Sequence, residues 1–545
     1  MRRKLAFVII AILLSFPGTT RATDDPPAAD PVEVRAEAEK MVRETAAIVP
    51  SLASPVNRVD AYLKLAQISW EIDDAITWSM LGAAGEDVKR YLAQVDIETN
   101  RVEAARSVSG RRGRSSDLRA KTNLAFGLRK DYVSTLAGFA PEQARAFASE
   151  TAEMFTNEGL RSRAQRENRS LESLIVKKIA ENDVGKALEI GVESLKKGVS
   201  SEVVGILNSV YKKDKAKGAE FGELIVDKIK SSSLEASRIW IASRLFQLGL
   251  ASADQTLPMF DTDGMKALAA AIASAVLSPD SRYTSLPSNV LDGIEKYSPG
   301  TASRITTTFE QRRAAREPKG ASAGSYSGST SEQAERIERD QARESARKYR
   351  DDLSKLLDAA GDGEATSEAR KEAISSARES ILSVDDDRFR YTNLAALAVR
   401  AYRAGETDDA VSMMKEAEMY LEAAPKERSD FSASMTIAQA YAIVDPDRAF
   451  TFFEEMAYRL NGVIDGYVRF AEYSGNGRTV ENGELLMNRY ARQFTGYFNL
   501  PENVVEGLAA HDLERLSDLP DRFDRPELRA ETKLMIVGAL LKSVE

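Results

Sequence analysis

The sequence predicts an all-α protein, an α-solenoid of stacked antiparallel helix hairpins in two arrays joined by a flexible linker. Apolar residues recur at three- and four-residue spacings along most of the chain, among residue types that favour helices. Alternation with a period of two, which is typical of strands, is scarce. The chain has 545 residues, more than one hydrophobic core usually supports, so several domains or an extended repeat array are expected.

Residues 1–22 have the three parts of a secretory signal peptide in the right order. A basic start precedes an apolar stretch over residues 5–14, and small residues up to Ala22 follow. The alternative is an uncleaved anchor, which we disfavour because the apolar stretch is shorter than the ~20 residues that span a bilayer. We therefore predict cleavage after Ala22 and a periplasmic or secreted mature chain without a membrane span.

The composition limits the possible functions. The chain has no cysteine, which excludes a lipoprotein anchor, a disulfide framework and a thiol nucleophile. Its net charge of −9 at pH 7 argues against a nucleic-acid partner, since non-specific binding to nucleic acid needs a basic surface. A local exception surrounds Arg111, Arg112 and Arg114. Two interpretations remain open there: contact with an anionic polymer of the cell envelope, or a solvated loop, which Gly110 and Gly113 favour.

Helix hairpins are predicted in the N-terminal half. Residues 59–84 have helical apolar spacing on both sides of Asp73, and residues 171–196 repeat this arrangement around Asp183. Because the helical spacing continues beyond these segments, we predict one N-terminal helical-repeat array over residues 23–317.

A stretch rich in glycine and serine interrupts the helical pattern at residues 318–333. Such a composition buries too little apolar surface to offset the entropy of ordering the chain, so we predict a flexible linker. The helical spacing then resumes, which predicts a C-terminal helical array over residues 334–545.

The clearest repeat lies within residues 391–456. Small residues such as Ala398 and Ala410, the turn residue Gly405 and the larger Met414 are spaced so that two helices can pack closely. A similar pattern recurs 39 positions further along the chain. This part resembles the tetratricopeptide repeat family, whose units are helix-turn-helix hairpins of about 34 residues. As a whole, the chain also resembles secreted bacterial helical proteins.

The resemblance implies a groove lined by the first helix of each unit, of the kind that binds peptides or protein segments. Tyr402 and Tyr441 occupy equivalent positions in the two units, so they form a ladder of aromatic surfaces or pack between neighbouring helices. The residues that the resemblance places in the groove are Thr392, Tyr402, Arg403, Phe431, Ser434 and Tyr441.

No catalytic, cofactor or metal site is predicted. The single histidine, His511, has no serine nucleophile motif to accompany it and is expected at a solvated helix end. The segment that begins at Asp261 starts like a calcium loop but lacks the length and the closing glutamate of an EF-hand. The aspartates before Phe389 are expected to begin a helix rather than to bind a cation.

The leading hypothesis is therefore a non-catalytic, exported helical-repeat scaffold that binds protein or peptide partners in the cell envelope. One alternative is a glycan-cleaving enzyme of the lytic-transglycosylase type, which joins a helical superhelix to a lysozyme-like domain. That family's Glu-Ser start followed by Gly-Leu-Met-Gln is not found in this sequence. The other alternative is a purely structural envelope protein.

Overall fold

The structure is a computed structural model that describes most of the chain. The described residues are 29–109, 115–231, 239–278, 281, 283–314, 351–362, 365–421, 428–474, 479–487, 498 and 500–544. The predicted signal peptide, the arginines at 111, 112 and 114 and the predicted linker at 318–333 lie outside them.

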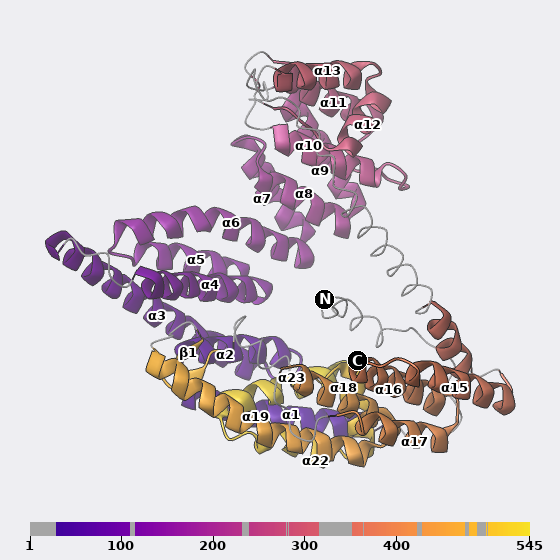
Figure 1. Ribbon diagram of the computed structural model, residues 1–545. Helices are drawn as coiled ribbons and strands as arrows, with labels where there is room; N and C mark the ends of the chain where they lie inside the picture. Colours follow the sequence, from indigo (N-terminus) through magenta and orange to yellow (C-terminus); the bar gives the residue numbers. More distant parts are fainter. Residues whose placement is uncertain are drawn as a thin grey trace. The chain divides into compact units, whose positions relative to one another are not determined.

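The described chain is all-α apart from one short β-hairpin, and its compact parts are two units (Figure 1). Unit 1 contains residues up to Asp87 together with the C-terminal part of the chain, and unit 2 begins at Val88. Unit 1 includes α1 (Pro31–Ile48), η1 (Val49–Ser51), α2 (Pro55–Ser69), the start of α3 (Asp74–Ser109), α15 (Ser367–Leu382), α16 (Asp387–Arg403), α17 (Thr407–Glu418), α18 (Arg428–Val444), α19 (Pro446–Ser474), β1 (Val480–Glu481), β2 (Glu484–Leu485), α21 (Glu502–His511), α22 (Leu513–Asp518), η3 (Leu519–Arg522) and α23 (Pro526–Val544).

Unit 2 is helical throughout its described residues. It continues α3 and includes α4 (Ser115–Phe139), α5 (Pro141–Glu153), α6 (Glu158–Asn182), α7 (Val184–Lys196), α8 (Ser201–Lys213), α9 (Lys215–Ser231), α10 (Ile239–Ser252), α11 (Thr262–Leu277), α12 (Ser288–Tyr297) and α13 (Thr301–Ala314). Consecutive helices pack as neighbouring pairs, for example α4 with α5, α8 with α9, α16 with α17 and α18 with α19. The predicted α-solenoid of stacked hairpins is confirmed.

Short polar side chains begin many of these helices by accepting a hydrogen bond from a backbone N–H of the first turn. The turns predicted in the N-terminal half work in this way. Asp73 accepts hydrogen bonds from the N–H groups of Ala75 and Ile76 at the start of α3, and Asp183 accepts one from Lys186 at the start of α7. Because each cap satisfies a donor that the helix itself leaves free, these residues fix where one helix ends and the next begins.

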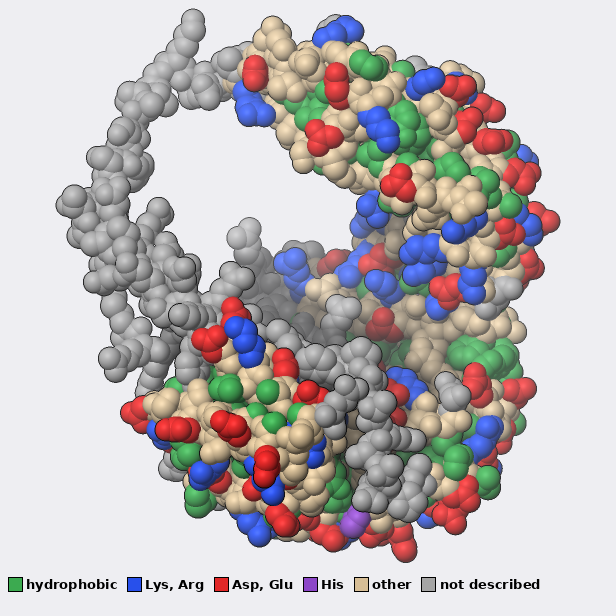
Figure 2. All heavy atoms as spheres, turned by 90° about the vertical axis from the view of Figure 1, so that its right-hand side faces the viewer, with side chains coloured by type: hydrophobic (Ala, Val, Ile, Leu, Met, Phe, Trp, Pro, Cys, Tyr) green, Lys and Arg blue, Asp and Glu red, His purple; other side chains and the backbone are tan. Residues whose placement is uncertain are grey.

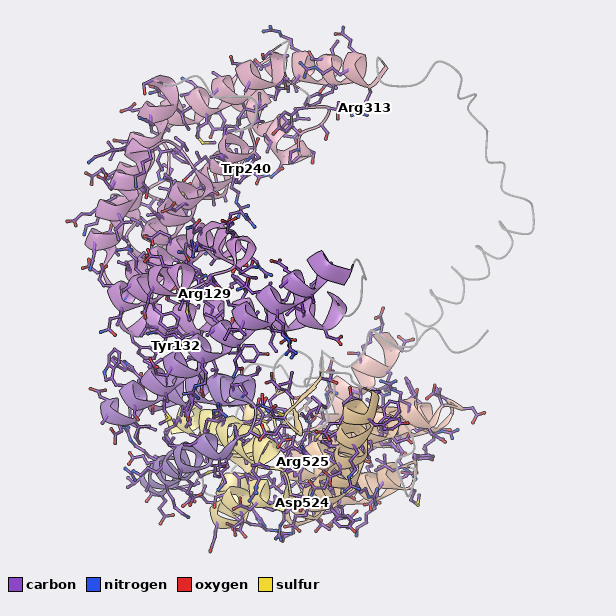
Figure 3. The ribbon with its side chains drawn as sticks, turned by 90° about the vertical axis from the view of Figure 1, so that its left-hand side faces the viewer. Arg129, Tyr132, Trp240, Arg313, Asp524 and Arg525 are labelled. Atoms are coloured by element: carbon purple, nitrogen blue, oxygen red, sulfur yellow. The ribbon has the colours of Figure 1, made fainter. Side chains whose placement is uncertain are left out.

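Buried polar side chains in unit 2 also join helices. Arg129 of α4, labelled in Figure 3, is fully buried and donates to the hydroxyl of Thr151 at 2.8 Å and to the carbonyl of Ala148 at 2.5 Å. Its guanidinium also donates to the Asn168 side chain of α6. Burial lowers the pKa of Arg129 to about 10. This side chain therefore ties α4 to α5 and α6, at the cost of burying a positive charge.

In unit 1, the two ends of the chain pack together. Helices α1 and α2 lie against α23, and Figure 1 shows all three in the same part of the unit. Lys533 of α23 is buried and pairs with Glu44 of α1 at 2.7 Å, while Lys64 of α2 pairs with Glu531 of α23 at 2.6 Å.

This packing differs from the two arrays expected from the sequence. Residues 29–87 were assigned to an N-terminal array over residues 23–317, but in the structure they belong with the C-terminal helices of unit 1. The physical reason is that α23 completes its core against α1 and α2, which come from the other end of the chain.

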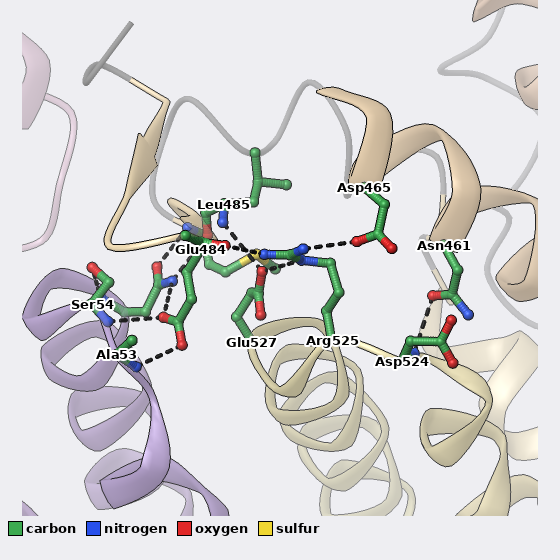
Figure 4. Close-up of polar contacts among 12 residues, drawn as sticks. Ala53, Ser54, Asn461, Asp465, Glu484, Leu485, Asp524, Arg525 and Glu527 are labelled. Atoms are coloured by element: carbon green, nitrogen blue, oxygen red, sulfur yellow. Dashed lines mark hydrogen bonds and ion pairs between the residues drawn. The ribbon is translucent and has the colours of Figure 1, made fainter. Parts of the chain in front are cut away.

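The β-hairpin contacts both the segment before α2 and the start of α23. Its turn residues Asn482 and Gly483 both have positive φ angles, 52° and 79°, as a tight two-residue hairpin turn requires. The hairpin projects the carboxylate of Glu484 toward the residues just before α2, where it accepts hydrogen bonds from the backbone N–H groups of Ala53 (2.6 Å) and Ser54 (3.0 Å) (Figure 4). A carboxylate is favourable there because the free N–H groups at a helix N-terminus carry partial positive charge.

A half-buried arginine, Arg525, contacts the other side of the hairpin. Arg525 pairs with Glu527 at 2.6 Å and with Asp465 of α19 at 2.8 Å, and it donates to the carbonyl of Gly483 (Figure 4). Burial raises the pKa of Glu527, and the neighbouring guanidinium opposes that shift. The hairpin is thereby fixed to both α19 and α23.

Candidate functional site

The best candidate site lies where the two predicted repeat units meet. Asp386 caps the start of helix α16, and its carboxylate accepts a hydrogen bond of 2.9 Å from the N–H of Phe389. The helix ends before Gly405, whose φ of +87° is a left-handed conformation that glycine adopts without strain. The chain then returns as α17, and α18 packs beside α16. A pocket of about 130 Å³ lies between α16 and α18, and we call it the α16/α18 pocket.

Equivalent faces of the two helices line this pocket. On α16 the face contains Thr392, Ala396, Val399 and Arg403, which follow helical spacing. On α18 the same spacing recurs 40 positions later. The full lining is Arg388, Tyr391, Thr392, Ala395, Ala396, Val399, Arg400, Arg403, Ser432, Thr436, Gln439, Ala440 and Ile443.

The pocket carries an excess of positive charge. Arg388, Arg400 and Arg403 all come from α16. Arg400 lies 3.4 Å from the carboxylate of Asp358, and burial, together with the nearby Arg403, lowers its pKa. Within the described part of the chain, no carboxylate forms an ion pair with Arg388 or Arg403. The lining therefore suits a partner group that brings negative charge.

The remainder of the lining is apolar or uncharged. Ala395 and Ala440 are buried, and burial raises the pKa of Tyr391, so its phenol stays protonated at neutral pH. Hydroxyl groups of Thr392 and Thr436 stand beside these apolar residues in the lining. The arrangement can therefore accept an apolar side chain and hydrogen-bond an extended backbone beside a cationic rim.

The structure brings some of the predicted groove residues to this pocket. Thr392 and Arg403 line it, whereas Tyr402 is half-buried and lies outside the lining. Phe431 is buried, and Ser434 is buried with its hydroxyl donating to the carbonyl of Asp430. Neither of these two residues lines the pocket.

Tyr441 packs between helices rather than facing the pocket. It is buried, its hydroxyl donates to the carboxylate of Glu418 at 2.9 Å, and its ring stacks on Phe452 at 5.6 Å between centroids. Burial, reinforced by Glu418, raises the pKa of Tyr441. Tyr402 and Tyr441 therefore do not form an aromatic ladder along the pocket.

Sequence reasoning did not include Arg388, Arg400, Thr436 and Gln439 in the site. The signal that could have found them is the recurrence of the pocket face after 40 residues, where the resemblance to the tetratricopeptide family suggested 39. A shift of one residue turns a helix by about 100° and exchanges one face for another.

The other candidate residues have structural roles. His511 is the last residue of α21 and lies 3.2 Å from the carboxylate of Asp447, and Figure 2 shows the histidine at the surface beside acidic side chains. Asp261 accepts a hydrogen bond from the N–H of Gly264 and so begins α11. Among the described residues, no group of three or more acidic or histidine side chains is placed to bind a metal ion.

Comparisons with known proteins add little to this picture. No family model and no curated protein matches the sequence. A solved structure described as "Circular tandem repeat protein with novel repeat topology and enhanced subunit contact surfaces" is similar to this chain at 13% identity. The similarity covers 94% of this chain and 96% of that one, with a TM-score of 0.16. The fold class above rests on the helices and their packing, not on this similarity. None of the described helices has both the length and the apolar character needed to cross a membrane.

Proposed function

We propose that this protein is a non-catalytic helical-repeat scaffold that binds a protein or peptide segment with acidic side chains in the α16/α18 pocket. The observation that carries the proposal is a pair of arginines, Arg388 and Arg403, that line the pocket without an ion-pair partner among the described residues. Guanidinium groups bind carboxylates through paired charge-assisted hydrogen bonds. The apolar floor supports an apolar side chain next to the acidic one.

We further propose that the scaffold acts in the bacterial cell envelope or outside the cell. This rests on the signal-peptide pattern of residues 1–22. Expression in a bacterium should yield a mature chain that begins near Thr23 outside the cytoplasm. An intact N-terminus on protein found in the cytoplasm would contradict this assignment. We also assign the α16/α17 and α18/α19 hairpins to a tetratricopeptide-like arrangement, although α19, with 29 residues, is longer than one helix of such a unit.

A display library of random peptides tests the binding function directly. The purified mature chain, residues 23–545, is used to select peptides, and the best peptide is then labelled and titrated by fluorescence anisotropy. We expect selected peptides to carry Asp or Glu next to an apolar residue. Their affinity should fall as salt increases, because the attraction depends on charge.

Two matched double variants separate the pocket from general charge. Arg388→Glu with Arg403→Glu should weaken the selected peptide by about tenfold or more, since each charge-assisted hydrogen bond is worth ~1.5–3 kcal/mol. Lys217→Glu with Lys415→Glu changes the net charge equally on exposed residues of α9 and α17 outside the pocket, and it should leave the affinity nearly unchanged. No peptide enrichment, or equal losses in both variants, would favour a purely structural role.

A further inference from the structure

Helix α19 has an exposed aromatic face that nothing else in the described structure explains. It runs along the lower-left margin of unit 1 in Figure 1. One face of the helix is buried through residues such as Leu460, Ile464 and Val468. On other faces, Tyr458 is 80% exposed, Phe470 66% and Tyr473 92%. Large aromatic side chains are usually buried, and a group of exposed ones marks an interaction surface.

Two glycines separate these aromatic residues. Gly462 and Gly466 are one helical turn apart, and a Cβ atom added to either would meet no other atom within 4 Å. Glycine in the interior of an exposed helix is less stable than alanine, so propensity does not account for them. Because neither glycine has a side chain, they leave a smooth strip along α19 against which a second helix can pack closely.

The exposed face is self-complementary about Ile464. Gly462 and Gly466 lie two residues on either side of it, and Glu455 and Tyr473 lie nine residues on either side. When two identical helices pack antiparallel about a two-fold axis at Ile464, each of these residues lies opposite its symmetric counterpart. Glycine then meets glycine, and a tyrosine hydroxyl meets a carboxylate that can accept its hydrogen bond.

The charged residues of the face fit the same arrangement. Tyr458 and Arg469 are eleven residues apart, which is about three helical turns, so they lie on one side of the glycine strip. Arg459 and Phe470 have the same separation and lie on the other side. The two-fold axis brings each side of one helix against the same side of the partner helix, in the reverse direction. Each arginine therefore lies opposite an aromatic ring and not opposite the other arginine. A guanidinium over an aromatic face is a favourable cation–π contact.

We propose that two copies of this chain form a homodimer through an antiparallel pair of α19 helices. Gly462 packs on Gly466 of the partner subunit, and Tyr458 packs on Arg469 of the partner subunit. An aromatic side chain buries about 150–250 Å². From the exposed fractions, the three aromatics contribute roughly 450–500 Å² per copy, so two copies with Val463 and the arginine stems bury about 1,000 Å² or more, the lower limit for a specific interface.

Analytical ultracentrifugation of the mature chain tests the dimer. We expect a monomer–dimer equilibrium that Gly462→Leu with Gly466→Leu shifts toward monomer, raising the dissociation constant by about tenfold or more. Leucine favours helix, so this variant should fold, and circular dichroism checks that it does. Gly82→Leu is the matched control, because Gly82 is an exposed helical glycine of α3 with open space around it. It should leave the equilibrium unchanged.

Cysteine cross-linking tests the antiparallel geometry, since the natural chain has no cysteine. A mixture of Gly462→Cys and Gly466→Cys copies should form a disulfide-linked dimer under mild oxidation, whereas either variant alone should cross-link far less. Efficient cross-linking of each variant with itself would indicate parallel helices and would overturn the geometry. A wild-type chain that stays monomeric up to about 100 µM would overturn the dimer. If such a monomer bound phospholipid vesicles through Tyr458 and Phe470, the face would belong to a lipid surface instead.

Discussion

The carboxylate of Glu484 should be one of the strongest single contributors to the stability of unit 1. It is buried and accepts hydrogen bonds from the N–H of Ala53 at 2.6 Å, the N–H of Ser54 at 3.0 Å and the side-chain amide of Asn57 at 3.1 Å. Glu484→Gln keeps the shape but removes the charge and turns one acceptor into a donor that faces other donors. Unsatisfied buried donors cost ~1–3 kcal/mol each and charge at a helix terminus contributes ~0.3–2 kcal/mol, so we expect a loss of about 2–4 kcal/mol.

Hydrogen exchange measured by mass spectrometry locates the effect, and urea unfolding measures its size. The backbone amides of Ala53 and Ser54, just before α2, should exchange about 30- to 1,000-fold faster in the variant, the factor that corresponds to ~2–4 kcal/mol for local opening. Glu481→Gln is the matched control on the same hairpin, because Glu481 accepts a hydrogen bond from the Ser54 hydroxyl at 2.7 Å and is less central to the network. It should cost about 1 kcal/mol or less. Unchanged exchange of the Ala53 and Ser54 amides in Glu484→Gln, or equal losses in the two variants, would refute this account.

Three further substitutions test the packing of unit 1. Gly405→Ala forces a residue with a side chain into a left-handed conformation, so the free energy of unfolding, measured with urea, should fall by ~1–2 kcal/mol. Gly538→Ala in α23 is the control, because Gly538 has open space around it, and this variant should not destabilise the protein. Lys533→Ala leaves Glu44 without its partner and empties a buried position, so the thermal midpoint of unfolding should fall and the backbone amides of α1 should exchange hydrogen faster. Unchanged protection of the α1 amides would contradict the pairing. Hydrogen bonds from Ser367 and then Arg370 of α15 lower the pKa of Glu406, so its contribution to stability is present above the ordinary glutamate pKa and is lost as the pH falls through the lowered one. Glu406→Gln should therefore flatten the loss of stability on acidification below about pH 4.5, as measured by urea unfolding at several pH values.

The helices and their turns could be predicted from the sequence because their causes are local. Apolar spacing sets the buried face of each helix, and a capping residue such as Asp183 or a turn glycine such as Gly405 sets its end. These signals lie within a few residues of the structure that they determine.

The division into units could not be predicted in the same way. Lys533 would be expected on the surface, yet it is buried against Glu44, which is 489 positions away along the chain. Glu484 likewise resembles any other acidic residue until the fold brings the N–H groups of Ala53 and Ser54, just before α2, opposite it. Contacts of this kind leave no periodic signal in the sequence, because neither partner is recognisable alone.

The candidate site was predicted in part for a related reason. The repeat pattern identified α16 and α18 as the helices that face each other, and it placed Thr392 and Arg403 on the right face. Of the two alternatives left open for Tyr441, the structure shows packing between helices, because the buried hydroxyl of that residue needs a partner. The partner is Glu418, which another helix supplies.

The supports of the α16/α18 pocket extend to both ends of the chain. Helix α18 packs on α21, where Gly507 lets the two helices approach so closely that a Cβ atom would lie 3.1 Å from the carbonyl oxygen of Ala442. Helix α21 in turn packs on α23, and α23 packs on α1 and α2. Helix α18, which lines one side of the pocket, is therefore connected by a continuous series of packed helices to α1 and α2. The binding function proposed above therefore predicts an indirect role for the N-terminal helices, because they support α18 while the pocket itself is lined by other residues of α18 and by α16.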